Sequence, residues 1–146
     1  MKISTKGRYA VRLMIDIAQH SNGESISLKD ISKRQDISLK YLEQIVNMLA
    51  KAGFLKSRRG SQGGYKLLRK PEEYTIGDIL RVTEGELAPV SCLESEAETC
   101  PREGLCPTIK LWQGLYDAIN TYLDSITVAD LVKDAEKNDG ALFYCI

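Results

Sequence analysis

The chain of 146 residues is poor in histidine and has no long hydrophobic run. Its only histidine is His20, and its first residues, Met1 to Lys6, carry charge rather than an apolar segment. A membrane span needs about 20 consecutive apolar residues, so we expect a cytoplasmic protein that is not embedded in a membrane. A nucleophilic cysteine enzyme needs a histidine base, so we expect no enzyme and no catalytic residues.

Closely spaced cysteine pairs, internal repeats and low-complexity tracts are also missing from the sequence. Cysteine pairs with two residues between them are typical of zinc knuckles and ribbons, so the absence of such pairs disfavours these sites. The cytosol keeps thiols reduced, so we do not expect the four cysteines to form structural disulfides. They are candidates for metal ligands, redox sensors or inert core thiols.

Charge is divided unevenly along the chain. Residues 1–74 contain 15 Lys and Arg against 7 Asp and Glu, a formal charge of +8, whereas residues 75–146 contain 5 against 13, a charge of −8. A concentrated basic half supplies the local field that phosphate binding needs, although the whole chain is neutral. The alternative is that the two halves merely attract each other.

The basic half predicts three helices with a tight turn between the last two. Thr5 is the expected N-cap of a largely buried helix that ends near Gln19. A second helix is expected to begin at Ser27 and a third at Ser38, with Gly53 as the stop of the third. Two short helices joined in this way, the second with a polar N-terminus, are typical of a helix-turn-helix.

Residues 54–67 predict the wing of a winged helix. They form two strand-like runs around a glycine-rich basic tip, and glycine lets such a tip approach a duplex closely. An arginine at the tip can enter a narrow minor groove, where the potential is most negative. The expected DNA-contacting residues are Ser38, Lys40, Tyr41, Glu43 and Gln44 in the third helix and Arg59 and Ser61 in the wing.

Simpler explanations exist for several of these residues. Lys40 and Arg59 can be ordinary solvated charges, and Tyr41 can equally be a core aromatic. Gln44 can pair with adenine and Glu43 can accept a hydrogen bond from cytosine, but a carboxylate near phosphates otherwise repels. Glu43 is therefore either a specificity determinant or simply exposed.

The acidic half predicts helices on both sides of an irregular loop. Thr75 and Asp78 begin a short helix that ends at Thr83, and residues 85–105 then show no apolar period. Pro107 is expected at the first position of a long helix whose apolar residues recur at spacings of three and four. These apolar residues are Trp112, Leu115, Tyr116, Ile119, Tyr122, Leu123 and Ile126.

This long apolar stripe favours a homodimer, because a second copy of the same helix is the simplest surface that can cover it. The alternative is packing against the basic half. A last helix is expected from Thr127 to about Glu136, followed by an apolar tail at residues 141–146 that docks elsewhere. The sequence therefore predicts a mostly α fold with a small β wing. It consists of a winged helix-turn-helix domain, residues 1–83, and a segment of cysteine loop, dimerisation helix and C-terminal helix and tail, residues 84–146.

Three cysteines lie in the loop, at Cys92, Cys100 and Cys106, separated by seven and five residues. Thiolates are soft donors that suit an iron-sulfur cluster, and the loop has only Arg102 and no lysine to lower the pKa of a nucleophilic thiol. We therefore favour a metal site for an iron-sulfur cluster. Zinc and three reduced structural thiols are the alternatives.

Five short stretches of this sequence form a distinctive set: residues 4–11, residues 37–44, the Arg59 to Tyr65 segment, and the pairs 111–112 and 126–127. In these stretches the chain resembles the winged-helix regulators that include the iron-sulfur cluster regulator IscR, the nitric-oxide sensor NsrR and the cysteine-metabolism repressor CymR. The resemblance covers nearly the whole chain and is greatest to the IscR branch.

The resemblance to the IscR branch implies a dimer that binds double-stranded DNA and controls iron-sulfur biogenesis genes. It also implies a 2Fe-2S cluster held by three loop cysteines and one histidine. The recognition-helix residues Ser38 to Gln44 are then expected in the major groove and Arg59 in the minor groove. The position of Glu43 is linked in that branch to a change of DNA specificity between cluster-bound and cluster-free forms.

The sequence also departs from that pattern. Ile109 stands where IscR has the histidine, and the first gap between cysteines is two residues longer. The fourth ligand is left open among Cys145, Glu94, Glu103, a residue of the partner subunit and an exogenous thiol. NsrR-type proteins use a carboxylate near position 8, where this chain has Arg8.

CymR-type proteins suggest the main alternative function. They lack the cysteine loop, but their apolar tails resemble residues 143–146 of this chain. In this alternative the regulator carries no cluster, and a partner enzyme or thiol oxidation controls it. A zinc-stabilised structural domain is a third hypothesis.

Overall fold

The computed structural model describes the backbone of residues 1–144 and the side chains of residues 1–139. The described residues contain six α-helices and two β-strands. They are α1 (Thr5–His20), α2 (Leu28–Gln35), α3 (Leu39–Lys51), β1 (Leu55–Arg58), β2 (Gly64–Leu67), α4 (Ile76–Glu84), α5 (Ile109–Asp124) and α6 (Val128–Tyr144). Three single-turn 3-10 helices, η1 (Pro71–Glu73), η2 (Ser91–Leu93) and η3 (Glu103–Leu105), lie between them.

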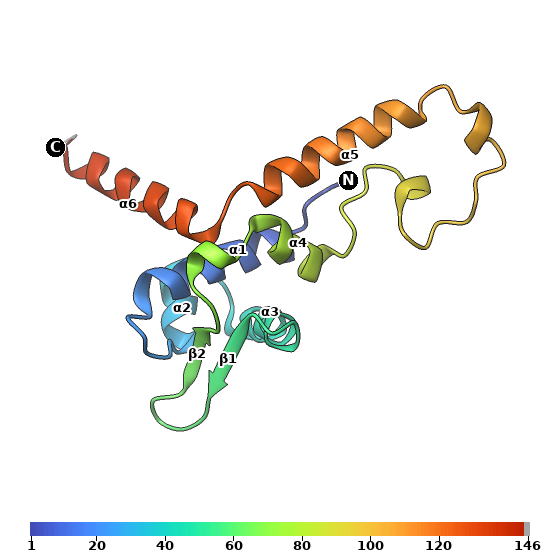
Figure 1. The fold of residues 1–146 in the computed structure, drawn as a ribbon. Helices are drawn as coiled ribbons and strands as arrows, with labels where there is room; N and C mark the ends of the chain where they lie inside the picture. The colour runs from blue at the N-terminus through green and yellow to red at the C-terminus, as the bar shows by residue number, and fades with distance from the viewer. Residues whose placement is uncertain (145–146) are drawn as a thin grey trace.

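The elements form a body with two projecting arms (Figure 1). Helices α1 to α4 and the β1–β2 hairpin make the body, and α5 and α6 diverge from its upper side. The segment between α4 and α5 runs outward to the far end of one arm, and α5 returns along that arm to the body. No helix in the described part of the chain is both long and apolar enough to cross a membrane.

One hydrophobic core joins the helices of the body to the start of α6. Leu13 of α1, Ile31 of α2, Leu49 of α3 and Ile79 of α4 are fully buried, and so is Val128 of α6. Leu13, Ile31, Leu49 and Ile79 lie on the apolar faces that the spacing of their helices predicts. Since burial of one such side chain contributes roughly 1.5–3 kcal/mol, this core stabilises the body.

The helix starts in the body are fixed by side-chain caps. Ser27 accepts a hydrogen bond from the backbone N–H of Asp30, and Ser38 accepts one from Tyr41, which confirms both predicted N-caps. The first N-cap was predicted one residue too late, because Ser4 caps α1 and Thr5 is already helical. Ser4 has the extended backbone that a cap requires, and its Oγ accepts from the N–H of Gly7.

A tight turn joins α2 to α3. Asp36 lies in the left-handed region, with φ 53° and ψ 48°, a conformation that aspartate tolerates better than most residues. Ile37 then turns into the core, where it is 4% exposed, and the Ser32 hydroxyl donates to its carbonyl at 2.6 Å. This buried anchor fixes the angle between the two helices.

The β1–β2 hairpin is antiparallel, with Leu55 opposite Leu67 and Lys56 opposite Lys66. A bridge between Ile26 and Tyr65 attaches it to the segment before α2, through N–H to carbonyl hydrogen bonds of 2.9 and 2.8 Å. The hairpin follows the helix-turn-helix directly, as the wing of a winged helix does. The predicted mostly α fold with a small β wing is therefore confirmed.

The two long C-terminal helices differ from the predicted bounds. Helix α5 begins at Ile109 and not at Pro107, and Thr108 is its N-cap residue, with φ −111° and ψ −3°. Helix α6 continues to Tyr144 instead of ending near Glu136. A glycine such as Gly140 costs a helix only about 1 kcal/mol relative to alanine, which does not suffice to end it. The predicted docking of the tail concerns side chains outside the described residues.

Candidate nucleic-acid interface and cysteine pocket

Helix α3 presents a polar face opposite its buried face. Leu42, Ile45, Val46 and Leu49 point into the core. The predicted contact residues Ser38, Lys40, Glu43 and Gln44 are all exposed. Sequence reasoning missed the exposed Asn47, although its spacing of four from Glu43 and three from Gln44 places it on the same face. The helix can therefore lay this polar face into a major groove.

Tyr41 differs from its neighbours on α3 because it is half-buried. Its ring meets that of Tyr9 edge to face, with centroids 5.7 Å apart and an interplanar angle of 89°. The guanidinium of Arg12 lies over the other ring of the pair, 5.2 Å from the centroid of Tyr9. Tyr41 thus packs against α1 at the edge of the core while it stays on the recognition helix.

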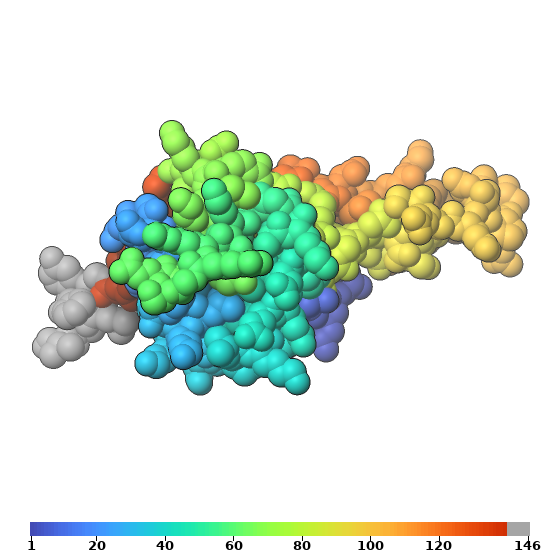
Figure 2. All heavy atoms as spheres, turned by 90° about the horizontal axis from the view of Figure 1, so that it is seen from below, coloured from blue at the N-terminus to red at the C-terminus, as the bar shows by residue number. Residues whose placement is uncertain are grey.

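The wing has a rigid base and an exposed tip. Tyr74 is fully buried, and its hydroxyl donates to the carbonyl of Phe54 at 2.8 Å, which anchors the chain just before β1. At the tip Arg59 and Ser61 are exposed, as predicted for DNA contacts, and Gly60 adopts a φ of 107° that favours glycine. The space-filling view from below shows α2, α3 and the wing on one face of the body (Figure 2).

A second basic surface lies on the outer face of the wing and was not predicted. Lys56 and Lys66 are directly opposite each other across the strands, and with Arg58 they line a hollow of about 310 Å³. Only one carboxylate lines this hollow, Glu24, whose Oε2 is 3.8 Å from a guanidinium nitrogen of Arg58. Like charges that face each other across a sheet are unfavourable, so an anion such as a phosphate would stabilise this arrangement.

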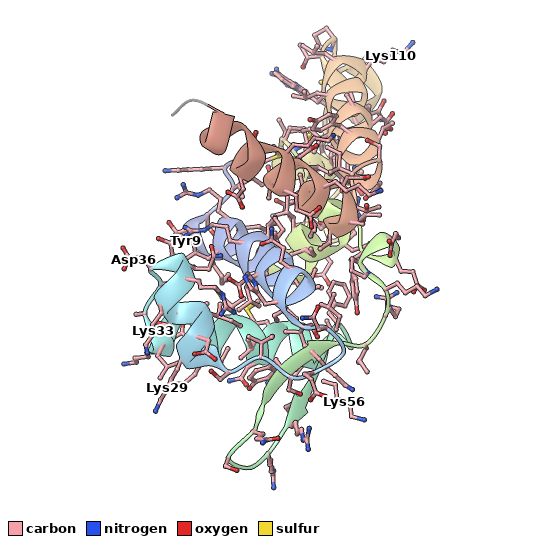
Figure 3. All side chains as sticks on the ribbon, turned by 90° about the vertical axis from the view of Figure 1, so that its left-hand side faces the viewer. Tyr9, Lys29, Lys33, Asp36, Lys56 and Lys110 are labelled. Carbon is pink, nitrogen blue, oxygen red and sulfur yellow. The ribbon has the colours of Figure 1, made fainter. Side chains whose placement is uncertain are left out.

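Exposed lysines lie beside the wing and on α2. Lys56 projects outward beside the wing, and Lys29 and Lys33 project from α2 (Figure 3). These side chains account for part of the predicted concentration of positive charge. Their sign is the one that a DNA backbone requires, and they carry no sequence information.

An ion pair between the buried Asp16 and the more exposed Arg34 holds α2 against α1. The Asp16 carboxylate is fully buried and accepts hydrogen bonds from Arg34, with Nη2 to Oδ1 at 2.7 Å and Nε to Oδ2 at 3.0 Å. The Gln35 amide also donates to it, at 2.9 Å. The hydrogen bond with Asp16 raises the pKa of Arg34 and keeps its guanidinium charged. This pair fixes the first helix of the helix-turn-helix.

The three loop cysteines line one hollow at the far end of the arm. Cys92, Cys100 and Cys106 share a cavity of about 180 Å³ with three glutamates, Glu94, Glu98 and Glu103. Cys92 and Cys100 are exposed, whereas Cys106 is half-buried. Among the described residues no three histidine, cysteine or acidic side chains are close enough together to hold a metal ion. The fold therefore gathers the predicted ligands around one space without closing them into a coordination site.

The thiol of Cys106 makes a hydrogen bond with a neighbouring side chain. Its Sγ is 3.5 Å from Oγ1 of Thr108. This hydrogen bond, followed by those with the backbone N–H groups of Thr108 and Ile109, lowers the pKa of Cys106. A thiolate is the form that ligates metals, so the start of α5 favours the form of Cys106 that a cluster needs.

The remaining lining residues bear on the fourth ligand. Ile109 and Gln113, one turn apart on α5, both face the cysteine hollow. The hydrocarbon side chain of Ile109 cannot ligate a metal. Cys145, another predicted candidate, lies outside the described residues.

Helix α4 connects the body to the arm through Arg81. Its Nη2 is 2.8 Å from the Asp124 carboxylate and 2.9 Å from the side-chain oxygen of Asn120, both on α5. The hydrogen bond with Asp124 raises the pKa of Arg81. Gly77 lies so close to Asp124 that a Cβ atom there would collide with its carboxylate. The helix that precedes the cysteine loop is thus joined to the helix that follows it.

Two short helices joined by a buried turn, an exposed polar face on the second, and a basic hairpin beside it define a winged helix-turn-helix regulator that binds DNA. The model of the Rrf2 family, described as "Iron-dependent Transcriptional regulator", matches residues 3–134. The chain belongs to this family, whose members are transcription regulators that bind DNA, typically as dimers.

Individual relatives cover almost the entire chain. It is 43% identical to the HTH-type transcriptional regulator CymR of Bacillus subtilis over 145 residues, 99% of each protein. It is 40% identical to the HTH-type transcriptional regulator IscR of Aliivibrio salmonicida over 136 residues, 93% of this chain and 80% of that protein.

The solved structures also include an IscR and a CymR protein. The structure of T. potens IscR matches with a TM-score of 0.74 and 43% identity, over 94% of this chain and 90% of that one. The structure of B. subtilis CymR also matches with a TM-score of 0.74, at 44% identity, over 91% of this chain and 97% of that one. The similarity to both relatives is nearly equal.

Proposed function

We propose that this protein is a homodimeric transcription regulator whose choice of DNA is controlled by an iron-sulfur cluster on Cys92, Cys100 and Cys106. The observation that carries the proposal is the single hollow shared by all three thiols. Three soft donors suit iron-sulfur ligation, and 2Fe-2S is the cluster type that we assign. The genes of iron-sulfur biogenesis are the proposed targets, as the resemblance to the IscR branch implies.

The proposed division of labour follows the shape of the chain. Residues 1–83 bind DNA, through Ser38, Lys40, Tyr41, Glu43 and Gln44 in the major groove and Arg59 and Ser61 at the wing. Residues 84–146 carry the cluster loop and the dimer contact. When bound, the cluster supplies a cross-link that draws the cysteines together, and its loss on oxidation or iron shortage releases them.

The Arg81 contacts connect the two helices that flank the cysteine loop to each other and to the body. The cysteine loop begins after α4 and ends at α5, and Arg81 holds these two helices together near the body. A loop that closes around a cluster changes the restraint on both helices. Such a change needs to alter DNA affinity by only a few kcal/mol to select between operators, which is about the cost of one or two mismatched base pairs.

The first experiment is the visible absorption spectrum of protein purified without oxygen. Iron-sulfur charge-transfer bands that bleach in air are expected for the wild type and for the control Ser91→Ala, and their loss is expected in Cys92→Ala. A colourless wild type that takes up no iron and sulfide would overturn the proposal. Unchanged colour and operator choice in Cys92→Ala would do the same.

DNA binding is tested separately from the cluster. Arg59→Ala should lower operator affinity at matched salt by about 1–3 kcal/mol if the arginine reads base edges. The control Arg102→Ala removes an exposed arginine at the far end of the arm and should leave the affinity unchanged. Equal operator affinity of Arg59→Ala and the control would exclude the assigned role of the wing tip.

The nearly equal similarity to CymR supports a second candidate function. In it the protein binds the same DNA face, carries no cluster, and responds to a partner enzyme or to thiol oxidation. A colourless protein whose operator affinity falls after mild peroxide treatment and recovers with dithiothreitol would favour this candidate.

A further inference from the structure

A 2Fe-2S cluster needs one more protein ligand than the three cysteines supply. Each iron of such a cluster is bound by two bridging sulfides and two protein side chains, which makes four protein ligands. The question of the fourth ligand rests on the cluster proposed above. The two hollows on the cysteine loop indicate which side chains lie on the same side as each cysteine.

Two of the cysteines belong together. Cys92 and Cys100 line the 180 Å³ hollow and also a second hollow of about 380 Å³ on the same loop. Cys106 lines only the smaller of these two hollows. Cys92 and Cys100 therefore lie on a shared side of the site, and the missing ligand would come from the side of Cys106.

The residues that line only the smaller hollow limit the choice of that ligand. Besides Cys106 they are Leu93, Thr99, Glu103, Ile109 and Gln113. Leu93 and Ile109 have no donor atom, and the hydroxyl of Thr99 and the amide of Gln113 are neutral. Glu103 alone offers an anionic oxygen, a donor type that iron accepts in protein sites.

The position of Glu103 in the chain also fits. It begins η3, three residues after Cys100 and three residues before Cys106, and its N–H donates to the carbonyl of Cys100 at 3.0 Å. Within the described residues its carboxylate makes no hydrogen bond or ion pair, whereas the carboxylate of Glu86 is occupied by the N–H of Ser95. We propose that Glu103 is the fourth ligand, on the side of the site where Cys106 lies.

The test compares four versions of the full-length protein reconstituted with iron and sulfide without oxygen. They are the wild type, Glu103→Ala, Glu103→Cys and the control Glu96→Ala, which removes a carboxylate of the same loop that lines neither hollow. Iron and sulfide content, the lifetime of the visible absorbance in air, and the electron paramagnetic resonance spectrum of the reduced protein are measured. Circular dichroism checks the fold of each variant.

Glu103→Ala is expected to lose iron or to hold a labile cluster. Removal of an outer-shell partner already costs roughly 10–100-fold in metal affinity, so loss of a ligand should shorten the absorbance lifetime about tenfold or more. Glu103→Cys should recover the full iron content with a shifted resonance spectrum, because sulfur replaces oxygen. Glu96→Ala should match the wild type.

The outcomes separate this inference from the proposed function. A wild type that forms a cluster, together with an unchanged Glu103→Ala variant, would overturn the assignment of Glu103 and leave the cluster proposal intact. The same result with a labile cluster in Gln113→Ala or Cys145→Ala would assign the ligand to one of those residues instead. A wild type that forms no cluster would overturn both.

Discussion

The Asp16 carboxylate shows how one residue sets the position of an element. It is fully buried between α1 and α2 and is satisfied by Arg34 and Gln35. Removal of Arg34 would leave this buried carboxylate without a compensating charge, and the cost of such a loss is about 3–5 kcal/mol. Arg34→Ala should therefore lower the free energy of unfolding, measured by urea denaturation, by about 3 kcal/mol.

An exposed ion pair provides the control for Asp16. Glu24 faces Arg58 at 3.8 Å, and its side chain is 79% exposed. Surface pairs of this kind contribute about 0–1 kcal/mol, so Glu24→Ala should leave the denaturation midpoint almost unchanged. Equal midpoints for the two variants would show that the Asp16 network does not stabilise the body.

The reactivity of Cys106 should depend on Thr108. The Thr108 hydroxyl lowers the pKa of this thiol, so at neutral pH more of it is thiolate than in an ordinary cysteine. In the metal-free protein, Thr108→Val should raise the pKa and slow alkylation of Cys106 by iodoacetamide at pH about 7. The difference should vanish at a pH well above both pKa values, where the thiol is ionised in either form.

Mass spectrometry of the alkylated peptides gives the rate for Cys106 as a function of pH. Thr99→Val is the control, because it removes a threonine hydroxyl beside Cys100 and leaves Thr108 in place. Superimposable pH profiles of Cys106 in Thr108→Val and the wild type would refute the role of the hydroxyl.

Local signals at single residues were predictable, and distant partners were not. The N-caps Ser27, Ser38 and Thr75 each accept a hydrogen bond from the backbone N–H of the residue three positions later. Both residues of such a pair lie close together in the sequence, so the pattern can be recognised there. Asp16 went unnoticed because its partner Arg34 is 18 positions away and becomes a neighbour only when α2 packs on α1.

At the scale of elements, the attachment of the wing depends on a close approach of two backbones. Gly64 begins β2 beside Ile26, and a Cβ atom at position 64 would collide with the backbone carbonyl of Ile26. The bridge between Ile26 and Tyr65 would have to open to make room. A side chain at this position therefore separates the wing from the body.

Gly64→Ala should lower the free energy of unfolding by about 1–3 kcal/mol, the usual cost of overpacking, and weaken operator binding through a misplaced wing. Hydrogen exchange at the amides of Ile26 and Tyr65 should become faster. Gly104→Ala is the matched control, because a Cβ atom at that loop position meets nothing within 4 Å. Native exchange rates at both amides in Gly64→Ala would contradict this account of the wing.

Elements with a clear period were predicted more reliably than the loop between them. The four helices of the body and the hairpin follow from apolar spacing, caps and glycines, and so do most residues of the proposed DNA face. The cysteine hollow involves Ile109 and Gln113 of α5, and no periodic signal in residues 85–105 indicates that they meet the cysteines. Its lining depends on how an irregular chain folds back, which sequence patterns do not specify.

At the scale of the whole molecule, the two projecting helices explain why a single copy leaves apolar surface uncovered. Among the described residues, Leu111, Leu115 and Tyr122 of α5 are 60%, 43% and 66% exposed, and no residue of α5 is fully buried. The predicted stripe packs on the core along its second half, through Tyr116, Ile119, Leu123 and Ile126. The rest needs a partner, and the dimers typical of the family offer a second α5.

Leu115→Glu should place a charge in the middle of the α5 stripe and prevent this dimer. Light scattering after size exclusion should then give the mass of one chain, whereas the control Thr121→Glu, which adds the same charge to an exposed polar position of α5, should give a dimer. Each monomer would have to find its half-site alone. Because a linked second contact raises overall affinity by about 10²–10⁴-fold, operator affinity of Leu115→Glu should fall about 100-fold or more. A dimer of normal affinity in Leu115→Glu would mean that the stripe is covered by other means and that another surface joins the two copies.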